Sequence, residues 1–347
     1  MNMHLESPKR EAFELVSDAL QHLDEYRAQR DVRVLVSVKQ TLDSALEKDP
    51  DYFRAHYYSA IVDDLAGRSK EAVKTFTKLL NERPPFIDEV RYNLAVAEYH
   101  GYGHEALDRA IQHFSKVMND AKDPALQLLA RAGFAQANAM HMIPKNPDEP
   151  ELTKIQEYFE KALSESKKVM RDLPRQRGTW FRKPTIPEPT ADEIEWTAHN
   201  ARGMALMYSS DHFPKKSEPD WAEGRIKTLH DAIAELDLAD KLSPQNWANY
   251  CDMASARMRL GYYDKKHSKS WDDAISILET VVTRLRPGYP FAMYEMGRIL
   301  RLQGQFAKAI ELFDKVLAIP LEQRDISDRR PTIERKRAVD QDRNVFP

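Results

Sequence analysis

A short pattern recurs along this chain at a spacing that constrains its fold more than any other feature. An alanine is followed four residues later by a bulky apolar residue, and a proline comes about eight residues after that. The clearest copies are Ala72, Phe76, Pro84 and Ala309, Phe313, Pro320. Successive prolines lie 34 residues apart from Pro50 to Pro84 and 33 residues apart from Pro287 to Pro320. A period of this length indicates an array of small similar units, each of which buries its apolar face only by stacking on a neighbour.

Each unit has the pattern of two helices. In its second half, apolar residues recur at i, i+3, i+4 and i+7, as across residues 309–317, which is typical of an amphipathic helix. The following proline ends that helix, because proline lacks the backbone N–H. In the first half a small residue marks where two helices cross, and these residues are Ala60, Ala95, Ala254 and Gly297. We expect Gly67, Gly261 and Gly304 in the turns between paired helices, where glycine tolerates positive φ.

One segment favours a different structure when considered alone. Residues 32–38 are rich in β-branched side chains, which are typical of a strand. The chain offers no partner strand for them, and they continue into the helical pattern of residues 42–48. We therefore predict that they begin the second helix of the first pair.

The best unit resembles the tetratricopeptide repeat consensus, in which bulky side chains fill holes left by alanine and glycine. It runs through Met293, Met296, Gly297, Leu300, Gly304, Phe306, Ala309, Ile310, Phe313 and Pro320. The resemblance covers about residues 8–320, with four convincing copies and three degenerate ones. It implies an all-α fold, a right-handed superhelical solenoid of about seven antiparallel helix pairs.

This interpretation divides the chain into a solenoid over residues 1–320 and a charged tail over residues 321–347. Inserts interrupt the solenoid near residues 173–190, 209–224 and 262–270. Long proline-rich loops in a folded protein are usually functional or disordered. For the tail, which has little apolar periodicity, we predict a short capping helix followed by disorder.

Charge and composition exclude several classes of function. Lys and Arg total 52 against 55 Asp and Glu, so the net charge of −3 gives no global attraction to nucleic acid or anionic membranes. No stretch is apolar enough for a membrane span, and the first ten residues lack the apolar core of a signal peptide. The single cysteine, Cys251, cannot form an internal disulfide, which favours a reducing compartment and cytoplasmic localisation.

The family resemblance implies a concave binding groove on the inner faces of the first helices. The stripe around each small residue supplies the candidate partner-binding residues: Tyr57, Asp64, Tyr92, Tyr99, Asn200, Met204, Met207, Met258, Tyr294, Arg298 and Arg301. Tyr and Arg are favoured at binding hot spots, and Met is favoured on adaptable peptide-binding surfaces. The stripe suits a peptide with acidic groups near one end. The alternative is that some of these side chains, Tyr57, Tyr92 and Tyr294 above all, pack between helices.

A second candidate is the basic and aromatic insert formed by Arg175, Arg177, Trp180, Phe181 and Arg182. Arginines with aromatic residues can dock a protein partner or stack on bases. The alternative is a loop that folds back and pairs its charges with nearby acidic residues. Its sequence leaves these three interpretations open.

Signals for metal binding or catalysis are weak. His100 and His104 have the spacing of two metal ligands on one helix face, but glycines lie between them and no third ligand follows at a clear spacing. We find no Gly-rich phosphate loop, nucleophile elbow or zinc-protease motif. We therefore predict no metal, no cofactor and no enzymatic activity.

The predicted function is binding: an adaptor or scaffold that captures a protein or peptide partner in its groove. The alternative is a peptide-gated regulatory receptor whose curvature changes when the ligand binds. An enzyme with an unrecognised site and a nucleic-acid-binding protein acting through Arg175 and Arg177 are further alternatives. The sequence leaves the partner and the oligomeric state open, because the end faces of a solenoid can pair.

Overall fold

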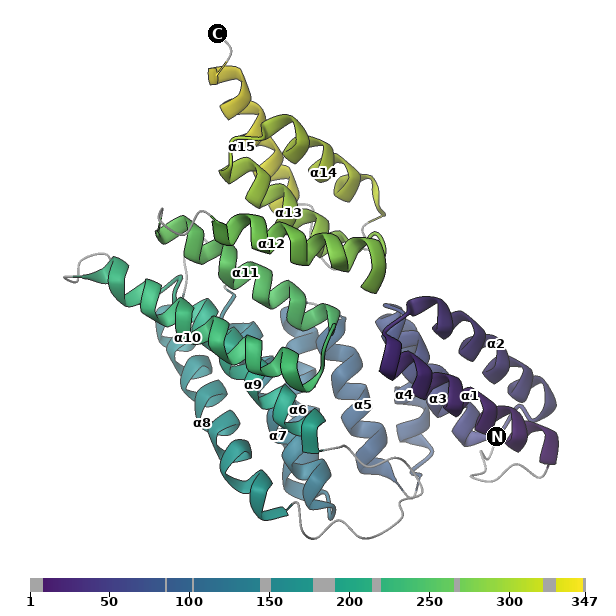
Figure 1. Ribbon diagram of the computed structural model, residues 1–347. Coiled ribbons are helices and arrows are strands. Elements are labelled where there is room, and N and C mark those ends of the chain that lie inside the picture. Colours follow the sequence, from purple (N-terminus) through teal and green to yellow (C-terminus); the bar gives the residue numbers. More distant parts are fainter. Residues whose placement is uncertain are drawn as a thin grey trace. The chain divides into compact units, whose positions relative to one another are not determined.

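The computed structural model describes residues 9–84, 86–101, 103–143, 151–176, 191–213, 220–264, 269–320 and 329–345. Within these ranges the chain forms fifteen α-helices and one short π-helix, with no β-strand (Figure 1). The predicted all-α, tetratricopeptide-like solenoid of helix pairs is confirmed. Consecutive helices such as α1 and α2, α3 and α4, or α13 and α14 pack on one another.

The helices α1 to α14 give the seven expected pairs. Their bounds are α1 Arg10–Gln29, α2 Val32–Lys48, α3 Phe53–Leu65, α4 Ser69–Asn81, α5 Ile87–His100, α6 His104–Asp120, α7 Pro124–His141, α8 Leu152–Gln176, α9 Ala191–Ser209, α10 Trp221–Leu242, α11 Trp247–Tyr263, α12 Lys269–Thr280, α13 Pro290–Leu302 and α14 Phe306–Ala318. The π-helix, Val281–Leu285, continues α12. A last helix, α15, covers Arg329–Val345.

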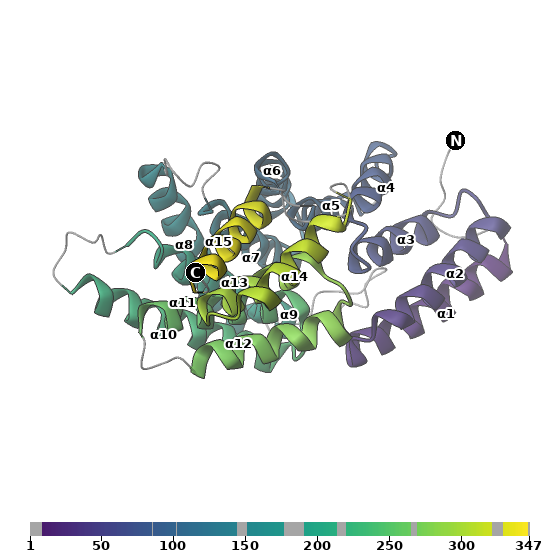
Figure 2. The same ribbon diagram turned by 90° about the horizontal axis from the view of Figure 1, so that it is seen from above.

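The β-branched segment at residue 32 is helical, as predicted. It opens α2, whose N-cap Asp31 accepts a hydrogen bond from the backbone N–H of Arg33. The buried residues of this helix are Leu35, Val38, Leu42 and Ala45, at intervals of three and four. That period matches one helix face, so packing against α1 outweighs the strand propensity of valine (Figure 2).

The two helices of a pair are buried differently. Second helices such as α4 bury one stripe, Ala72, Phe76 and Leu79. First helices such as α3 are buried around most of their circumference. A first helix therefore lies between its own partner and the neighbouring pair, which is why small residues occur on it.

Glycines on several first helices make room for bulky side chains of second helices. A Cβ at Gly297 would lie 2.6 Å from Cε1 of Phe313, and one at Gly133 would lie 2.6 Å from Cε1 of Phe114. A Cβ at Gly203 would lie 2.5 Å from Cγ of Leu236. The small-to-bulky packing expected from the repeat is thus present at these sites.

The turn glycines follow the prediction at two positions and depart from it at one. Gly67 and Gly304 have φ values of 82° and 78°, in the region that favours glycine. The expectation for Gly261 is wrong, because this residue lies inside α11. A Cβ there would come within 2.5 Å of Nε1 of Trp271, so the glycine allows that indole to approach the helix.

The chain divides into two compact units. Unit 1 comprises Met1–His141 and Glu160–Ala198, and unit 2 comprises Met142–Phe159 and His199–Pro347. The cores of unit 1 gather the apolar faces of α1 to α7 and the facing parts of α8 and α9. The cores of unit 2 include Met258 of α11, Leu278 of α12 and Phe313 of α14.

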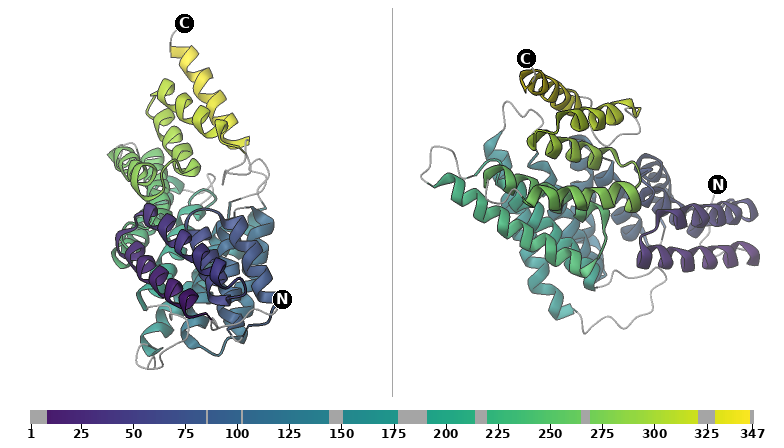
Figure 3. Two further views of the ribbon diagram at one scale, coloured as in Figure 1. Left: turned by 90° about the vertical axis from the view of Figure 1, so that its right-hand side faces the viewer. Right: turned by 45° about the horizontal axis from the view of Figure 1, so that its top comes forward.

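The predicted tail contains α15, a helix of 17 residues that is longer than the short cap expected from the sequence. It packs against α14 and also contacts α13 (Figure 3). Ala338 of α15 is fully buried and joins the cluster around Phe313. The basic tail therefore brings charged residues next to the last helix pair.

Candidate functional site

The predicted groove residues of unit 1 are engaged in internal contacts. The ring of Tyr57 is buried, and its hydroxyl accepts a hydrogen bond of 2.7 Å from Nδ2 of Asn93. Burial raises the pKa of Tyr57 far above its usual value. Tyr92 is half-buried, with its ring centroid 5.6 Å from that of Phe114, and burial raises its pKa as well. Both tyrosines join neighbouring helices.

Asp64 and Tyr99 lie in the same unit. The carboxylate of Asp64 accepts a hydrogen bond of 2.7 Å from Oγ of Ser69 and lies 2.8 Å from Nδ1 of His100. These contacts link α3 to α4 and to α5. Tyr99 is half-buried beside the core cluster that contains Phe114. Asp64 is therefore occupied by internal partners.

Most of the predicted groove residues of unit 2 are buried. They are Asn200, Met204, Met207, Met258 and Tyr294. Nδ2 of Asn200 donates hydrogen bonds of 3.1 Å to Oδ1 of Asn249 and of 3.1 Å to Oδ2 of Asp252. The role of these five residues in partner binding remains a prediction, and one of them, Met258, lines a hollow of unit 2.

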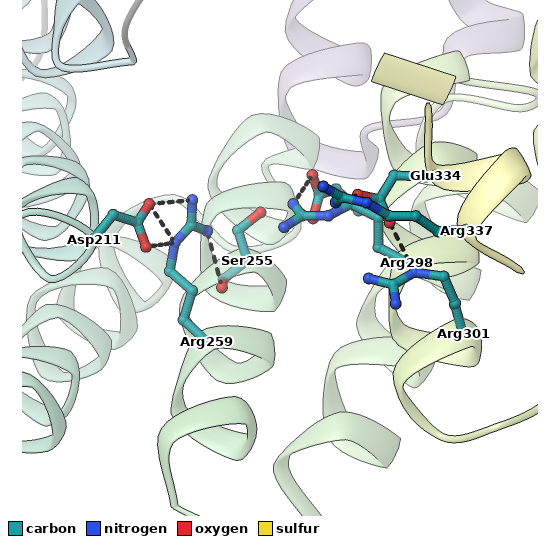
Figure 4. Close-up of polar contacts among 8 residues, drawn as sticks. Asp211, Ser255, Arg259, Arg298, Arg301, Glu334 and Arg337 are labelled. Atoms are coloured by element: carbon teal, nitrogen blue, oxygen red, sulfur yellow. Dashed lines mark hydrogen bonds and ion pairs between the residues drawn. The ribbon is translucent and has the colours of Figure 1, made fainter. Parts of the chain in front are cut away.

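The two remaining predicted residues, Arg298 and Arg301, line a hollow of about 190 Å³ in unit 2. We call it the arginine hollow (Figure 4). Its lining comes from the turn after α9, from α11, from α13 and from α15, and consists of Asp211, Met258, Arg259, Tyr262, Tyr263, Arg298, Arg301, Leu302, Glu334 and Arg337.

Arg259 of α11 forms one wall of the hollow. Its Nη2 and Nε atoms each lie 3.1 Å from Oδ2 of Asp211, and its Nη1 donates to the backbone oxygen of Ser255 at 3.2 Å. The guanidinium also lies 5.4 Å from the ring centroid of Tyr208. Burial by itself would lower the pKa of Arg259, but Asp211 outweighs it and the pKa is raised. The arginine therefore stays charged and is fixed in place.

Arg298 of α13 stands one position after the small residue of its repeat. Its Nη1 lies 2.9 Å and 3.0 Å from the two oxygens of Glu295, one turn earlier on the helix. Burial acts to lower the pKa of Arg298, but Glu295 and the other neighbouring acidic groups raise it well above its usual value. About a quarter of the side chain is exposed, at 28%.

Arg301, one turn further along α13, meets α15. Its Nε donates a hydrogen bond of 2.8 Å to Oε2 of Glu334. The other oxygen of Glu334 accepts a hydrogen bond of 2.7 Å from Nη1 of Arg337. Glu334 is buried, whereas the side chain of Arg337 is 60% exposed. One carboxylate therefore bridges two guanidinium groups.

The balance of charge in the hollow is positive. Four guanidinium groups, from Arg259, Arg298, Arg301 and Arg337, face three carboxylates, from Asp211, Glu295 and Glu334, which leaves one net positive charge. Arginine presents a planar fork of donors that matches a carboxylate or phosphate group. Such a hollow suits an anionic group on a ligand.

Aromatic side chains border the arginines. Tyr262, at the end of α11, is 61% exposed. The hydroxyl of Tyr263 accepts a hydrogen bond of 2.6 Å from Nη1 of buried Arg225, whose guanidinium lies 5.3 Å from the ring centroid of Trp221. The exposed ring of Tyr262 offers apolar contact area beside the charged groups.

Asp252 lies on α11 about two turns before Arg259, and Ser255 lies between them. Burial raises the pKa of Asp252 to about 7, although the hydrogen bond from Asn200 and the charge of Arg259 both act to lower it. The charge of this carboxyl group therefore changes near neutral pH.

Sequence reasoning found two of the four arginines. Arg259 lies five residues after Ala254, one position beyond the stripe used for prediction. Arg337 and Glu334 fall in the tail, for which the sequence predicted a short capping helix followed by disorder. The sequence does contain one sign of this site, since arginine recurs near the end of two successive first helices. Nothing in the sequence, however, indicates that α15 lies beside these arginines.

The second candidate site is the basic and aromatic insert. Arg177, Trp180, Phe181 and Arg182 lie outside the described residues, as does the side chain of Arg175.

The histidine pair is divided between helices. His100 ends α5 and His104 begins α6. Nδ1 of His104 lies 3.3 Å from Nδ1 of His141, while His100 contacts Asp64. No group of three or more potential metal ligands occurs among the described residues.

Comparison with known proteins is consistent with the repeat fold. A family model described as the tetratricopeptide repeat matches residues 290–319. Over 88 residues the chain is 35% identical to the tetratricopeptide repeat and J domain-containing co-chaperone DNJ1 of Cryptococcus neoformans var. grubii. That match covers 25% of this chain and 15% of the co-chaperone, so the chain spans less than a sixth of that relative's length.

Two solved structures are similar at low identity. A tetratricopeptide repeat protein from Parabacteroides merdae is 12% identical with a TM-score of 0.48, covering 95% of this chain and 100% of its own. A tetratricopeptide repeat protein of the thermophile Thermus thermophilus is 13% identical with a TM-score of 0.47, covering 73% of this chain and 98% of its own.

The stacked helix pairs define a class of protein, the helical-repeat solenoid. Within that class, the chain has a tetratricopeptide-like fold, and residues 290–319 match the tetratricopeptide repeat itself. None of the helices in the described ranges is long and apolar enough to cross a bilayer.

Proposed function

We propose that this protein is an adaptor that binds an acidic peptide segment of a partner protein in the arginine hollow of unit 2. The observation that carries the proposal is the convergence of Arg259, Arg298 and Arg301 from two successive first helices. Arginine is among the residues most enriched at binding hot spots, and its charge-assisted hydrogen bonds are stronger than neutral ones.

The rigidity of the site supports this role. Arg259 is held by Asp211 and Ser255, and Arg298 is held by Glu295, so their guanidinium groups are already ordered before a ligand arrives. Ordering long side chains in advance reduces the entropy lost on binding. Tyr262 adds an exposed aromatic surface on which an apolar residue of the peptide could rest.

We propose a binding role without catalysis and without a cofactor, because guanidinium, carboxylate, phenol and thioether groups in this arrangement suit recognition. We also propose that the protein works in the cytoplasm, since its single cysteine, Cys251, is a free buried thiol. The second function considered from the sequence, a peptide-gated receptor, requires two conformations. The contact between α13 and α15 is where such a change would occur.

The test is a titration of the full chain with a fluorescein-labelled glutamate-rich peptide and with its glutamine-substituted twin, followed by fluorescence anisotropy. We expect the glutamate peptide to bind, and we expect its affinity to fall as salt is added, since salt screens such pairs. Arg298→Gln should weaken binding about tenfold, the factor that corresponds to one charge-assisted contact.

The matched control is Arg257→Gln, which removes an arginine that lies on α11 and pairs with Asp237 at 3.0 Å. It does not line the hollow and should leave the affinity unchanged. Equal affinity for the two peptides, or equal losses in Arg257→Gln and Arg298→Gln, would reject the proposal. Thermal unfolding of each variant checks that the fold is retained.

A further inference from the structure

The last helix, α15, is attached to unit 2 through few buried apolar side chains and through a set of polar contacts. Between residues 331 and 342, its buried side chains are Pro331, Glu334 and Ala338. Ile333, an apolar residue of the same helix, is 39% exposed. A helix with so little buried apolar surface gains only a small hydrophobic stabilisation from docking.

Glu334 provides the central polar contact. Its carboxylate is buried, and each oxygen accepts a hydrogen bond from a different arginine: Oε2 from Arg301 at 2.8 Å and Oε1 from Arg337 at 2.7 Å. This is the geometry that an acidic side chain of a ligand would adopt on Arg301.

The positive charge of α15 makes the contact of Glu334 necessary for docking of this helix. Residues 329–339 contain five basic residues, and Glu334 is their single carboxylate. The arginine hollow also has a net positive charge, so without Glu334 the first half of α15 would be repelled by it. A further ion pair from this half, between Arg335 and Asp314, lies at an exposed position and is worth little.

We propose that α15 is a built-in competitor for the arginine hollow, in which Glu334 occupies Arg301 until an acidic partner peptide displaces it. This inference rests on the proposed function of the same site and adds its regulation. A protein whose binding-competent state is only partly populated shows an apparent affinity reduced by that fraction. Docked α15 therefore sets a threshold that a partner with several acidic groups can overcome.

Some arginines of the hollow belong to the helix pairs, and one belongs to α15. Arg259, Arg298 and Arg301 belong to α11 and α13 and remain when α15 leaves. Arg337 belongs to α15 and leaves with it. Loss of Arg337 should therefore not weaken binding of an acidic peptide, whereas a ligand that binds on top of docked α15 would depend on Arg337.

The experiment uses the full chain and the glutamate-rich peptide described above. Glu334→Gln should bind the peptide about five- to tenfold more tightly than the natural chain, because Arg301 loses its carboxylate partner and keeps only the hydrogen bond from its Nη1 to Oε1 of Gln341 on α15. The matched control is Asp340→Asn, which removes an exposed carboxylate from the same helix and should not change the affinity. Arg337→Gln should bind at least as well as the natural chain.

Hydrogen exchange gives a second, independent readout. Amides of residues 329–345 should exchange faster in Glu334→Gln without peptide, and in the natural chain once peptide is added. Unchanged or weaker binding by Glu334→Gln, or a loss in Arg337→Gln as large as that in Arg298→Gln, would overturn the inference while leaving the proposed function intact. If neither the natural chain nor Glu334→Gln binds the peptide, the proposed function fails, and the inference fails with it.

Discussion

The two units place different side chains at equivalent positions of the same repeat. Four residues after the small residue of a first helix, unit 1 has Asp64 and Tyr99, and the last repeat of unit 2 has Arg301. In unit 1 these side chains pack within the unit, as when Asp64 contacts Ser69 and His100. In unit 2 the corresponding position helps to form a positively charged hollow. The same repeat backbone therefore accepts at this position either a side chain that packs internally or one that lines a binding site. The reason is that the fold depends on the small and bulky residues and not on this position.

The units also differ in how they neutralise buried charge. Unit 1 gives a buried carboxylate a basic partner with partial access to solvent, as with Glu98 and Arg109, whose side chain is 52% exposed. Unit 2 collects several guanidinium groups around fewer carboxylates. In unit 1 the arginine offsets the desolvation penalty of one buried carboxylate. In unit 2 the guanidinium groups outnumber the carboxylates, so the site keeps a net positive charge that can attract a ligand.

The largest effects should come from the packing that the two units share. Gly133→Val in unit 1 and Gly297→Val in unit 2 each place side-chain atoms where a phenylalanine ring lies 2.6 Å from the Cβ position. We expect each variant to lose about 2–3 kcal/mol of stability, the upper part of the range for over-packing. Urea unfolding gives the loss, and hydrogen exchange assigns it to a unit.

Each loss should stay within the unit that carries the substitution. Phe114→Leu should recover part of the loss in Gly133→Val, and Phe313→Leu should do the same for Gly297→Val. If either glycine-to-valine variant unfolds at the same urea concentration as the natural chain, close packing of the phenylalanine ring against that glycine does not determine stability.

A smaller effect is expected from the buried carboxylate of unit 1. Burial raises the pKa of Glu98, while Arg109 acts to lower it. Arg109→Ala leaves the carboxylate without its guanidinium partner, and we expect a loss of about 1–3 kcal/mol. The loss should be larger at pH 8 than at pH 5, because protonated Glu98 needs no cation. Arg109→Lys, which keeps the charge, should lose less in urea unfolding, and a loss that ignores pH would contradict this account.

A pH-dependent effect should come from Asp252 in unit 2. Its pKa is raised to about 7 in the folded chain, so the folded state holds a proton that the unfolded chain releases near pH 4. Its contribution to stability is therefore fully present at low pH and is lost as pH rises from about 4 through 7. Asp252→Asn should remove this dependence and stabilise unit 2 at pH 8, where the natural side chain is ionised although it is partly buried.

Thermal unfolding of the natural chain and Asp252→Asn across that pH range tests the assignment. Asp237→Asn, which removes a carboxylate on α10, serves as the control for a general change in charge. If Asp252→Asn follows the pH dependence of the natural chain, Asp252 is not the titrating group.

Much of the fold was predictable because the pattern that encodes it is local. The alternation of alanine, bulky residue and proline gives the second helices and their ends, and Gly67 and Gly304 mark the turns. Gly261 misled the prediction, since glycine serves both turns and close packing, and only the position of Trp271 distinguishes the two.

The candidate site was less predictable than the fold. A first helix is packed on most sides, so a stripe of residues drawn from the sequence does not reveal which part of it stays open. Met204 and Met207 lie on that stripe and are buried, whereas Arg259 lies one position off it and lines the hollow.

The helices, their pairing and the small-to-bulky contacts follow from the sequence, because they depend on residues close together in the chain. Which charges meet follows from the arrangement of the helices in space. Arg259, Arg301 and Glu334 come from three helices separated by tens of residues, and their energies depend on distance and burial that no local pattern records.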